Sequence, residues 1–273
     1  MSQPSANIRF KAVFFDLDGT IYRGSEPVPG LCSFVESLRD EQVKTAFITN
    51  SANATPEIVC RRLSTLNIPS SEQQVITASQ AAARFVSELH GASGARVFTV
   101  AGPGLRSAME SEGHMFSECD VEYVVAGLDL KFTYEKLDKA SCFIRSGAQF
   151  IGTNPDLIYN REDGIHPGGG VIVRAIELAS GITPTIVGKP QPTMIKLALK
   201  EVGCTADQAL FIVDNLETDI PCGARAGVRT ALITTGVSKR EDLQNFQYQP
   251  DWVVDSYEEL RKLLVSERLL GSR

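Results

Sequence analysis

Two aspartates, Asp16 and Asp18, stand at the end of a short apolar run and are the first residues with active-site chemistry. The run 12–15 is β-branched and aromatic and is closed by Gly19, which predicts a buried strand rather than a helix. If the extended backbone continues through Asp18, both carboxylates point the same way and Leu17 points into the core. Carboxylates held this close raise the pKa of one of them unless a cation intervenes. The alternative is a strand followed by an Asp-Gly turn without chemistry.

Polar residues also stand at or just after the ends of three later apolar segments. They are Thr49 with Asn50, then Lys189, and then Asp214 with Asp219 five residues beyond it. The carboxyl ends of parallel strands open into one crevice of an open sheet, so residues far apart in sequence are expected to meet there. Carboxylates gathered in one crevice require a divalent hard cation, and oxygen ligands with a phosphate suit Mg²⁺. Lys189 adds a positive charge for phosphoryl oxygens.

An alternation of strands and helices surrounds these residues. Apolar periodicity predicts strands at 12–15, 44–48, 75–77, 185–187, 210–213, 231–234 and 252–254. It predicts helices at 30–41, 55–66, 79–89, 192–202, 218–226 and 257–270. This order is typical of a parallel sheet covered by helices on its faces. The sequence therefore predicts an α/β fold built on a doubly wound, Rossmann-like parallel sheet.

The alternation starts afresh in the middle of the chain. It predicts strands at 96–100, 123–125 and 150–151, helices at 103–112 and 134–145, a loop at 152–167 and a helix beginning near residue 169. We therefore expect a smaller α/β domain at 81–183, inserted into a discontinuous domain formed by 1–80 and 184–273. The alternative, one continuous sheet, requires more strands than an open sheet comfortably holds.

The composition is that of a globular chain with no nucleic-acid or membrane partner. The 273 residues are 43% hydrophobic and 22% charged, and the net charge is −6, so no basic field is available for nucleic acid or an anionic membrane. No apolar run approaches the roughly 20 residues that span a bilayer, and the first ten residues lack the apolar core of a signal peptide. We expect a cytoplasmic protein.

Cysteine and histidine do not form metal or redox motifs. The six cysteines form no CxxC and no cluster with zinc-like spacing, so we expect reduced, mostly buried thiols. The three histidines are scattered, which argues against a histidine-based metal site or triad.

Four motifs resemble, in order, the signatures of the haloacid dehalogenase superfamily of aspartate-nucleophile phosphatases. They are DLDGT at 16–20, TNS at 49–51, GKP at 188–190 and DNLETD at 214–219. The insertion between the second and third motifs resembles a type C2 cap domain. Together with GLDLKFTYEKL at 127–137, GTNPD at 152–156 and PGGG at 167–170, it resembles the NagD-like, 4-nitrophenylphosphatase branch.

The resemblance implies a catalytic role for the matched charged residues. Asp16 corresponds to the nucleophile that forms an aspartyl-phosphate, and Asp18 to the acid/base residue that protonates the leaving oxygen and later deprotonates water. The Asp16 carboxylate, the Asp18 carbonyl and Asp214 would hold Mg²⁺, with Asp219 near its waters. Lys189 would neutralise the transferring phosphoryl group.

The resemblance also implies which residues bind the substrate. Thr49 and the backbone amide of Asn50 would hold the phosphoryl group together with Lys189, and Ser51 belongs to the same motif. The cap would exclude phosphoproteins and select the leaving group, with Asn154 and Asp156 as candidate contacts. Caps in related proteins form dimer contacts, so a homodimer is a further expectation.

The sequence departs from the family pattern at three points. Val213 stands where glycine usually precedes Asp214, and it either pushes the metal-binding turn or points into the core. Ser51 replaces a residue that is often asparagine, and its hydroxyl still makes a local hydrogen bond. His166, before the glycine run 168–170, is expected on an exposed loop, and the glycine run is expected to form a tight cap-to-core turn.

The leading hypothesis is therefore a Mg²⁺-dependent phosphomonoesterase that acts on small phosphorylated metabolites. Two alternatives stay open. A non-catalytic metabolite-binding relative is supported only by Val213. A phospho-accepting signalling module would share the acidic strand ends, the threonine and the lysine, but receiver domains are shorter and carry no inserted domain.

Overall fold

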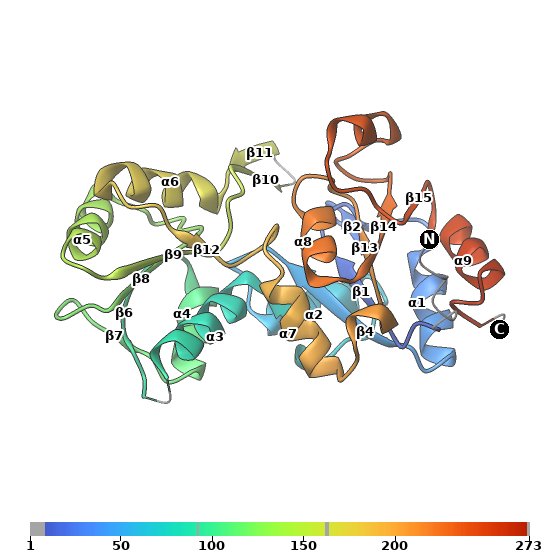
Figure 1. Cartoon of the computed structure of the whole chain (residues 1–273), viewed down its shortest axis with the longest axis horizontal. Helices are drawn as coiled ribbons and strands as arrows, with labels where there is room; N and C mark the ends of the chain where they lie inside the picture. The colour runs from blue at the N-terminus through green and yellow to red at the C-terminus, as the bar shows by residue number, and fades with distance from the viewer. Residues whose placement is uncertain (1–8, 92, 162–163, 272–273) are drawn as a thin grey trace, which may run out of the picture. The chain divides into compact units, whose positions relative to one another are not determined.

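The computed structural model describes residues 9–91, 93–161 and 164–271, and the chain divides into two compact units (Figure 1). The first unit comprises Met1–Thr49, Cys60–Val75 and Ile195–Arg273. The second comprises Asn50–Val59 and Ile76–Met194. Both units contain parallel sheets flanked by helices, so the predicted α/β fold class is confirmed.

The sheet of the first unit places its most apolar strands in the middle. The strand order is β15-β14-β13-β1-β4-β5, and β1 pairs in parallel with β13 on one side and β4 on the other. Every residue of β1 and β13 is buried, as expected for inner strands of a parallel sheet. The strands are β1 (Ala12–Asp16), β4 (Lys44–Thr49), β5 (Val75–Thr77), β13 (Ala209–Val213), β14 (Arg229–Ile233) and β15 (Trp252–Val254).

The helices of this part of the chain follow the predicted apolar periodicity. In α1, for example, Leu31, Phe34, Val35 and Leu38 are the buried face. The helices are α1 (Leu31–Asp40), α2 (Pro56–Thr65), α7 (Thr193–Val202), α8 (Asp219–Ala226) and α9 (Tyr257–Ser266), with 3₁₀ turns η1 (Glu72–Gln74), η2 (Ala206–Gln208) and η3 (Arg240–Asn245). Along the described part of the chain, none of the helices combines the length and apolar character that crossing a membrane requires.

The second unit has a five-stranded sheet of its own, in the order β12-β9-β8-β6-β7, with parallel pairing throughout. Its strands are β6 (Arg96–Val100), β7 (Met115–Phe116), β8 (Tyr123–Ala126), β9 (Gln149–Gly152) and β12 (Thr185–Ile186). Its helices are α3 (Ala78–His90), α4 (Pro103–Ser111), α5 (Tyr134–Arg145) and α6 (Gly169–Ser180).

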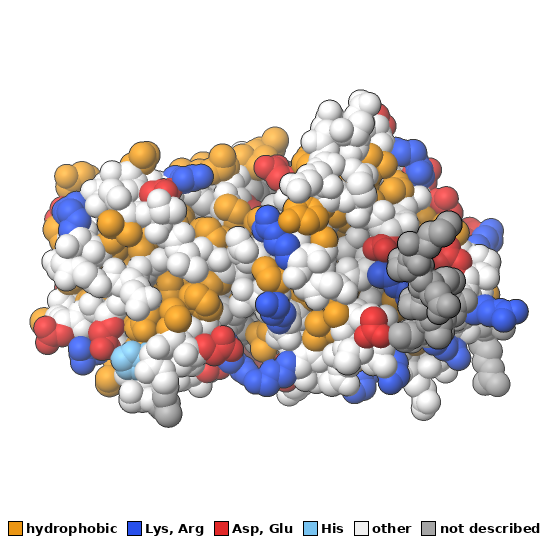
Figure 2. Space-filling model, in the orientation of Figure 1, with side chains coloured by type: hydrophobic (Ala, Val, Ile, Leu, Met, Phe, Trp, Pro, Cys, Tyr) orange, Lys and Arg blue, Asp and Glu red, His pale blue; other side chains and the backbone are white. Residues whose placement is uncertain are grey.

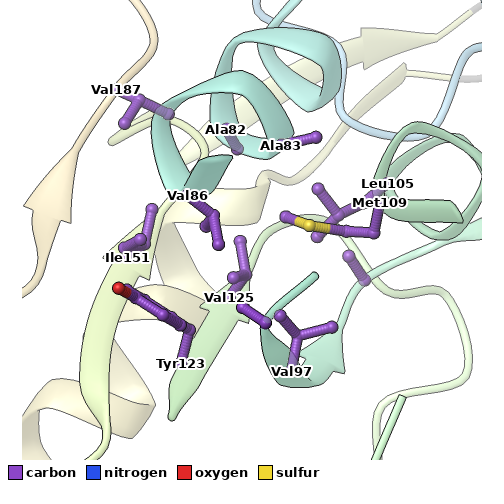
Figure 3. Close-up of a cluster of buried hydrophobic side chains, with 12 residues drawn as sticks. Ala82, Ala83, Val86, Val97, Leu105, Met109, Tyr123, Val125, Ile151 and Val187 are labelled. Carbon is purple, nitrogen blue, oxygen red and sulfur yellow. The ribbon is translucent and has the colours of Figure 1, made fainter. Parts of the chain in front are cut away.

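Alternating side chains of this sheet build two hydrophobic layers. On one face, Val125 and Ile151 pack with Val86 of α3 and with Leu105 and Met109 of α4 (Figure 3). On the other face, Val124, Ala126 and Phe150 pack against α5 and α6. This alternation, with period two along each strand, explains why helices cover both faces of the sheet (Figure 1).

The segment 152–167, predicted as a loop, contains a hairpin instead. Strands β10 (Ile158–Arg161) and β11 (Gly164–Pro167) pair antiparallel, and His166 lies on β11 opposite Tyr159. Each strand has only four residues, and Ile158 and Ile165 are exposed. The segment therefore lacks the run of buried apolar residues by which a strand is predicted from sequence. Exposed hydrophobic side chains also lie along α6, as Figure 2 shows over this unit.

Three smaller predictions are also corrected by the structure. The six cysteines are free thiols as expected, but only Cys222 is buried, whereas Cys119 and Cys142 are exposed. The last helix ends at Ser266 rather than near residue 270, because Arg268 adopts a positive φ of 61°. The glycine run 168–170 begins α6 and contacts backbone within its own unit, so it is not a cap-to-core turn.

A buried glutamate ties together elements from both ends of the first unit. Glu41 caps α1, and its carboxylate accepts hydrogen bonds from Arg261 at 3.0 Å, from Arg9 at 2.9 Å and from the amide of Gly271. Burial raises the pKa of Glu41, but these hydrogen bonds and the charge of Arg261 lower it by more, so its pKa lies below the ordinary value. Ionised Glu41 therefore stabilises the fold.

We expect Glu41→Gln to lower the free energy of unfolding at pH 7 by about 2 kcal/mol, because charged hydrogen bonds of this kind contribute roughly that much. The loss should become smaller in acid. A carboxyl group with a lowered folded pKa contributes stability above its unfolded pKa, near 4.3, and that stability disappears as pH falls through the folded pKa. Urea titrations at pH 7 and at about pH 3.5 measure the difference, with the exposed Glu36→Gln as control. A pH-independent loss would contradict the assignment.

Candidate active site

Three buried carboxylates meet at the carboxyl end of the first unit's sheet. Asp16 is the last residue of the central strand β1, Asp214 follows the neighbouring strand β13, and Asp219 is the first residue of α8. One carboxylate oxygen of each lies within 4.8 Å of the others, and the side chains are buried. The sequence predicted that these three residues meet, and the structure brings them together. Carboxylates so close repel one another, so the cluster is suited to holding a cation.

Thr49 lies at the same end of this sheet. It is the last residue of β4, which pairs with β1 in a register that sets Asp16 opposite Ile48. Thr49 is buried, with 4% of its surface exposed. The predicted order of strand ends is therefore reproduced, with β1 between the strands that carry Thr49 and Asp214.

Asp18 is not one of the three residues whose carboxylate oxygens lie within 4.8 Å of one another. Strand β1 ends at Asp16, and Gly19 turns the chain with a φ of 83°, so the extended backbone does not continue to Asp18. Asp18 is exposed, whereas Leu17 is buried as predicted. An exposed carboxyl group on a turn can exchange protons with solvent or a ligand, which suits the acid/base role that the resemblance implies.

The loop after β14 supports Asp214 and was not anticipated from the sequence. The amide of Val237 donates a hydrogen bond of 2.8 Å to the Asp214 carboxylate, and the hydroxyl of Thr235 donates one of 3.0 Å to the carbonyl oxygen of Gly19. β14 neighbours β13, so the loop after it reaches the same sheet end. The signal in the sequence was the Thr-Gly pair at 235–236, directly after the predicted strand 231–234.

Tyr257 of α9 is a second unanticipated residue beside the carboxylates. Its hydroxyl donates a hydrogen bond of 2.9 Å to the carbonyl oxygen of Thr20. Burial, and then the negative charges of Asp16 and Asp214, raise the pKa of Tyr257 well above its ordinary value. The phenol therefore stays protonated and keeps this hydrogen bond at physiological pH.

Val213 occupies a fully buried position at the end of β13. It pairs with Leu232 of β14 in a regular parallel register. Of the two outcomes weighed from the sequence, the side chain thus points into the core, and Asp214 remains within the carboxylate cluster.

In the second unit, the side chain of Asn50 holds the backbone of Lys189. The Asn50 carbonyl oxygen accepts the Lys189 amide at 2.8 Å, and the Asn50 amide group donates to the Lys189 carbonyl oxygen at 3.2 Å and to Asp156 at 2.9 Å. A Cβ on Gly188 would lie 2.3 Å from the Thr153 carbonyl oxygen, so only glycine allows this approach. Sequence reasoning assigned Asn50 only a backbone role and missed this contact.

The loop residues Asn154 and Asp156 join the same network. The Asn154 side-chain amide group donates to the backbone carbonyl oxygen of Asn50 at 2.7 Å, and the side-chain oxygen of Asn154 accepts the Asp156 amide at 3.1 Å. Asn154 and Lys189 are both buried. The hydroxyl of Ser51, the remaining predicted residue, accepts the amide of Ala54 at 3.3 Å, the local hydrogen bond expected of a serine there.

Family models match both ends of the chain. Residues 13–114 match a haloacid dehalogenase-like hydrolase model, and residues 186–260 match a second model described as HAD-hydrolase-like. Together these segments contain the strands and loops that carry the three clustered carboxylates and Lys189.

Curated relatives match over nearly the whole chain. The 5'-nucleotidase YutF of Bacillus subtilis is 36% identical over 250 residues, which are 92% of this chain and 97% of that protein. The acid sugar phosphatase of Staphylococcus epidermidis is 35% identical over 244 residues, 89% of this chain and 93% of that protein.

Solved structures of similar proteins have the same fold. NagD from Escherichia coli K-12 superposes with a TM-score of 0.85 at 29% identity, covering 92% of this chain and 98% of NagD. The 4-nitrophenylphosphatase of Thermotoga maritima gives 0.87 at 30% identity, covering 94% and 98%. With these matches beside the acidic strand ends, the chain belongs to the haloacid dehalogenase-like hydrolases and, among them, to the NagD-like phosphatases.

Proposed function

We propose that this phosphatase is a Mg²⁺-dependent phosphomonoester hydrolase that acts on small phosphorylated metabolites through an aspartyl-phosphate. The observation that carries the proposal is the cluster of Asp16, Asp214 and Asp219, with carboxylate oxygens within 4.8 Å of one another. A buried nucleophile next to two further carboxylates is productive only if a cation offsets the repulsion between the attacking oxygen and an anionic phosphate.

The residues around the cluster fit a magnesium ion. Carboxylate oxygens are the hard ligands that Mg²⁺ prefers, and the carbonyl oxygen of Asp18 would add another. Two glycines leave room for the Asp214 carboxylate, since a Cβ on Gly19 would lie 2.1 Å and one on Gly236 would lie 1.8 Å from its Oδ2 atom. Bound Mg²⁺ would neutralise charge on the phosphoryl oxygens and orient them for attack.

The chain's own residues account for both chemical steps. In the first, an Asp16 oxygen bonds to phosphorus while the bond to the leaving oxygen breaks, and Asp18 gives that oxygen its proton. In the second, Asp18 takes a proton from water, whose oxygen bonds to phosphorus and releases phosphate and Asp16. Thr49, the Asn50 amide and Lys189 would bind the phosphoryl oxygens throughout.

The lysine and the amide are preorganised in the second unit for this role. Asn50 accepts from and donates to the Lys189 backbone, and Asp156 in turn accepts from Asn50. A phosphate-binding lysine on a backbone fixed in this way loses little freedom when substrate binds. Ser51 belongs to the same segment, and the expectation that Asn154 and Asp156 contact the leaving group stays a prediction.

The remaining expectations from the sequence are part of the same proposal. We assign the catalytic core to 1–80 and 184–273 and the type C2 cap to 81–183, and we retain a cytoplasmic location and a homodimer as predictions. The buried position of Val213 removes the main support for a non-catalytic relative. Membership of the phosphatase family, with relatives matched over 97% and 98% of their length, also argues against a receiver-like signalling module.

We expect Asp16→Asn to lower kcat for 4-nitrophenyl phosphate by on the order of 10⁴-fold or more, because the amide cannot attack phosphorus. The fold should survive, since one oxygen is exchanged for nitrogen at the same place. Steady-state kinetics with Mg²⁺ and circular dichroism test both statements, with the exposed Asp40→Asn as a control. Near-normal turnover by Asp16→Asn would rule out the covalent mechanism.

We expect Gly236→Ala to raise the Mg²⁺ dissociation constant by about tenfold or more, because its Cβ displaces the Asp214 carboxylate. Isothermal titration calorimetry with Mg²⁺ alone measures this without relying on turnover. Gly203→Ala is the control for a glycine substitution away from the site, because no atom lies within 4 Å of the added carbon; its positive φ of 71° adds a backbone strain that Gly236→Ala lacks. Equal affinities for wild type and Gly236→Ala would place the ion elsewhere.

The names of the relatives predict the substrate class. We expect phosphate release from nucleoside 5'-monophosphates and sugar phosphates, whereas a phosphoserine peptide should be hydrolysed far more slowly if the cap restricts access. A phosphate-release panel with and without EDTA measures this. Hydrolysis of none of the small esters, or hydrolysis that is insensitive to EDTA, would contradict the proposal.

A further inference from the structure

An arginine on α2 contacts both a ring and a turn of the small hairpin that follows Asp18. The Arg62 guanidinium carbon lies 3.6 Å from the centroid of the Tyr22 ring. Its Nη2 atom donates a hydrogen bond of 2.8 Å to the carbonyl oxygen of Gly24. A planar guanidinium can stack on a ring and donate at its edge at the same time, which an ammonium group cannot. Arg62 thus holds the hairpin at two points.

The hairpin is short and mostly exposed. Its strands β2 (Tyr22–Arg23) and β3 (Glu26–Pro27) contain two residues each, and residues 23–26 are exposed. An isolated two-stranded hairpin is at best marginally stable in water. The buried Tyr22 ring and the two contacts of Arg62 therefore add support to a hairpin that two short strands hold only weakly.

The backbone of Tyr22 is hydrogen-bonded on both sides of Asp18. The Gly19 amide donates to the Tyr22 carbonyl oxygen at 2.8 Å, and the Tyr22 amide donates to the Leu17 carbonyl oxygen at 3.3 Å. Asp18 itself forms an isolated bridge with Tyr22. Any displacement of Tyr22 is therefore passed directly to the turn that carries Asp18.

We propose that Arg62 is a positioning residue that fixes Asp18 through Tyr22 and the β2–β3 hairpin. The inference rests on the proposed function, in which Asp18 gives its proton to the leaving oxygen. An acid must lie within hydrogen-bond reach of the atom it protonates, and Asp18 is an exposed residue on a turn. Small errors in its position therefore reduce proton transfer without affecting the bond between Asp16 and phosphorus.

The leaving group separates this role from a general loss of structure. 4-Nitrophenolate leaves readily without a proton, whereas the alkoxide of a sugar phosphate or nucleotide requires one. We expect Arg62→Ala to lower kcat/KM for a sugar phosphate by about three- to tenfold and for 4-nitrophenyl phosphate by less than about twofold. Arg62→Lys, which keeps the charge, should recover part of the loss. The value of kcat/KM is used because it reports the step in which the leaving group departs.

Two further measurements complete the test. Arg39→Ala removes the same charge from an exposed position on α1 and should change neither kcat/KM value. Hydrogen exchange by mass spectrometry should show faster exchange of peptides covering residues 17–24 in Arg62→Ala than in wild type. Equal losses on both substrates, no loss, or unchanged exchange would overturn the role of Arg62. Absence of turnover in the wild type would instead refute the proposed function.

Discussion

The repulsion among three buried carboxylates is the interaction on which the rest of this structure depends. Asp16, Asp214 and Asp219 come from a central strand, the loop after its neighbour and the start of a helix. Only a parallel sheet with β1 in its middle brings these chain segments to one end. Neighbouring groups are adapted to this negative charge. The Val237 amide donates a hydrogen bond to Asp214. Burial, together with the charges of Asp16 and Asp214, raises the pKa of Tyr257, so its hydroxyl stays protonated.

The parts of the site that lie at strand ends could be predicted from the sequence. Apolar runs located β1, β4 and β13, and parallel topology then required Asp16, Thr49 and Asp214 to share one end of the sheet. The exact end of strand β1 could not be predicted in this way. Strand β1 ends at Asp16, before the alternation reaches Asp18, and Gly19 turns the chain with a positive φ.

Contacts between side chains and distant backbone were the second gap. The hydrogen bond from the Lys189 amide to the Asn50 side chain joins residues 139 positions apart, and no local sequence pattern predicts it. Likewise, the hairpin β10–β11 has short, outward-facing strands whose sequence resembles a loop. Hydrophobic periodicity in a sequence reveals an element only when one face of that element is buried. It therefore cannot predict an element that is held by hydrogen bonds or lies on the surface.

The position of β1 also has a consequence for the synthesis of this protein. β1 is made early, yet one of its two neighbours in the sheet is β13, which is made much later. The segment after β1 accepts a hydrogen bond at Thr20 from Tyr257, which lies 237 residues further along the chain. Contacts of such long range slow folding, because the entropy of closing a long loop is lost before the contacts form. Strand β1 therefore lacks its partner β13 until most of the chain has left the ribosome. During translation, this unpaired apolar strand is prone to aggregate, and a chaperone that covers it would protect the chain.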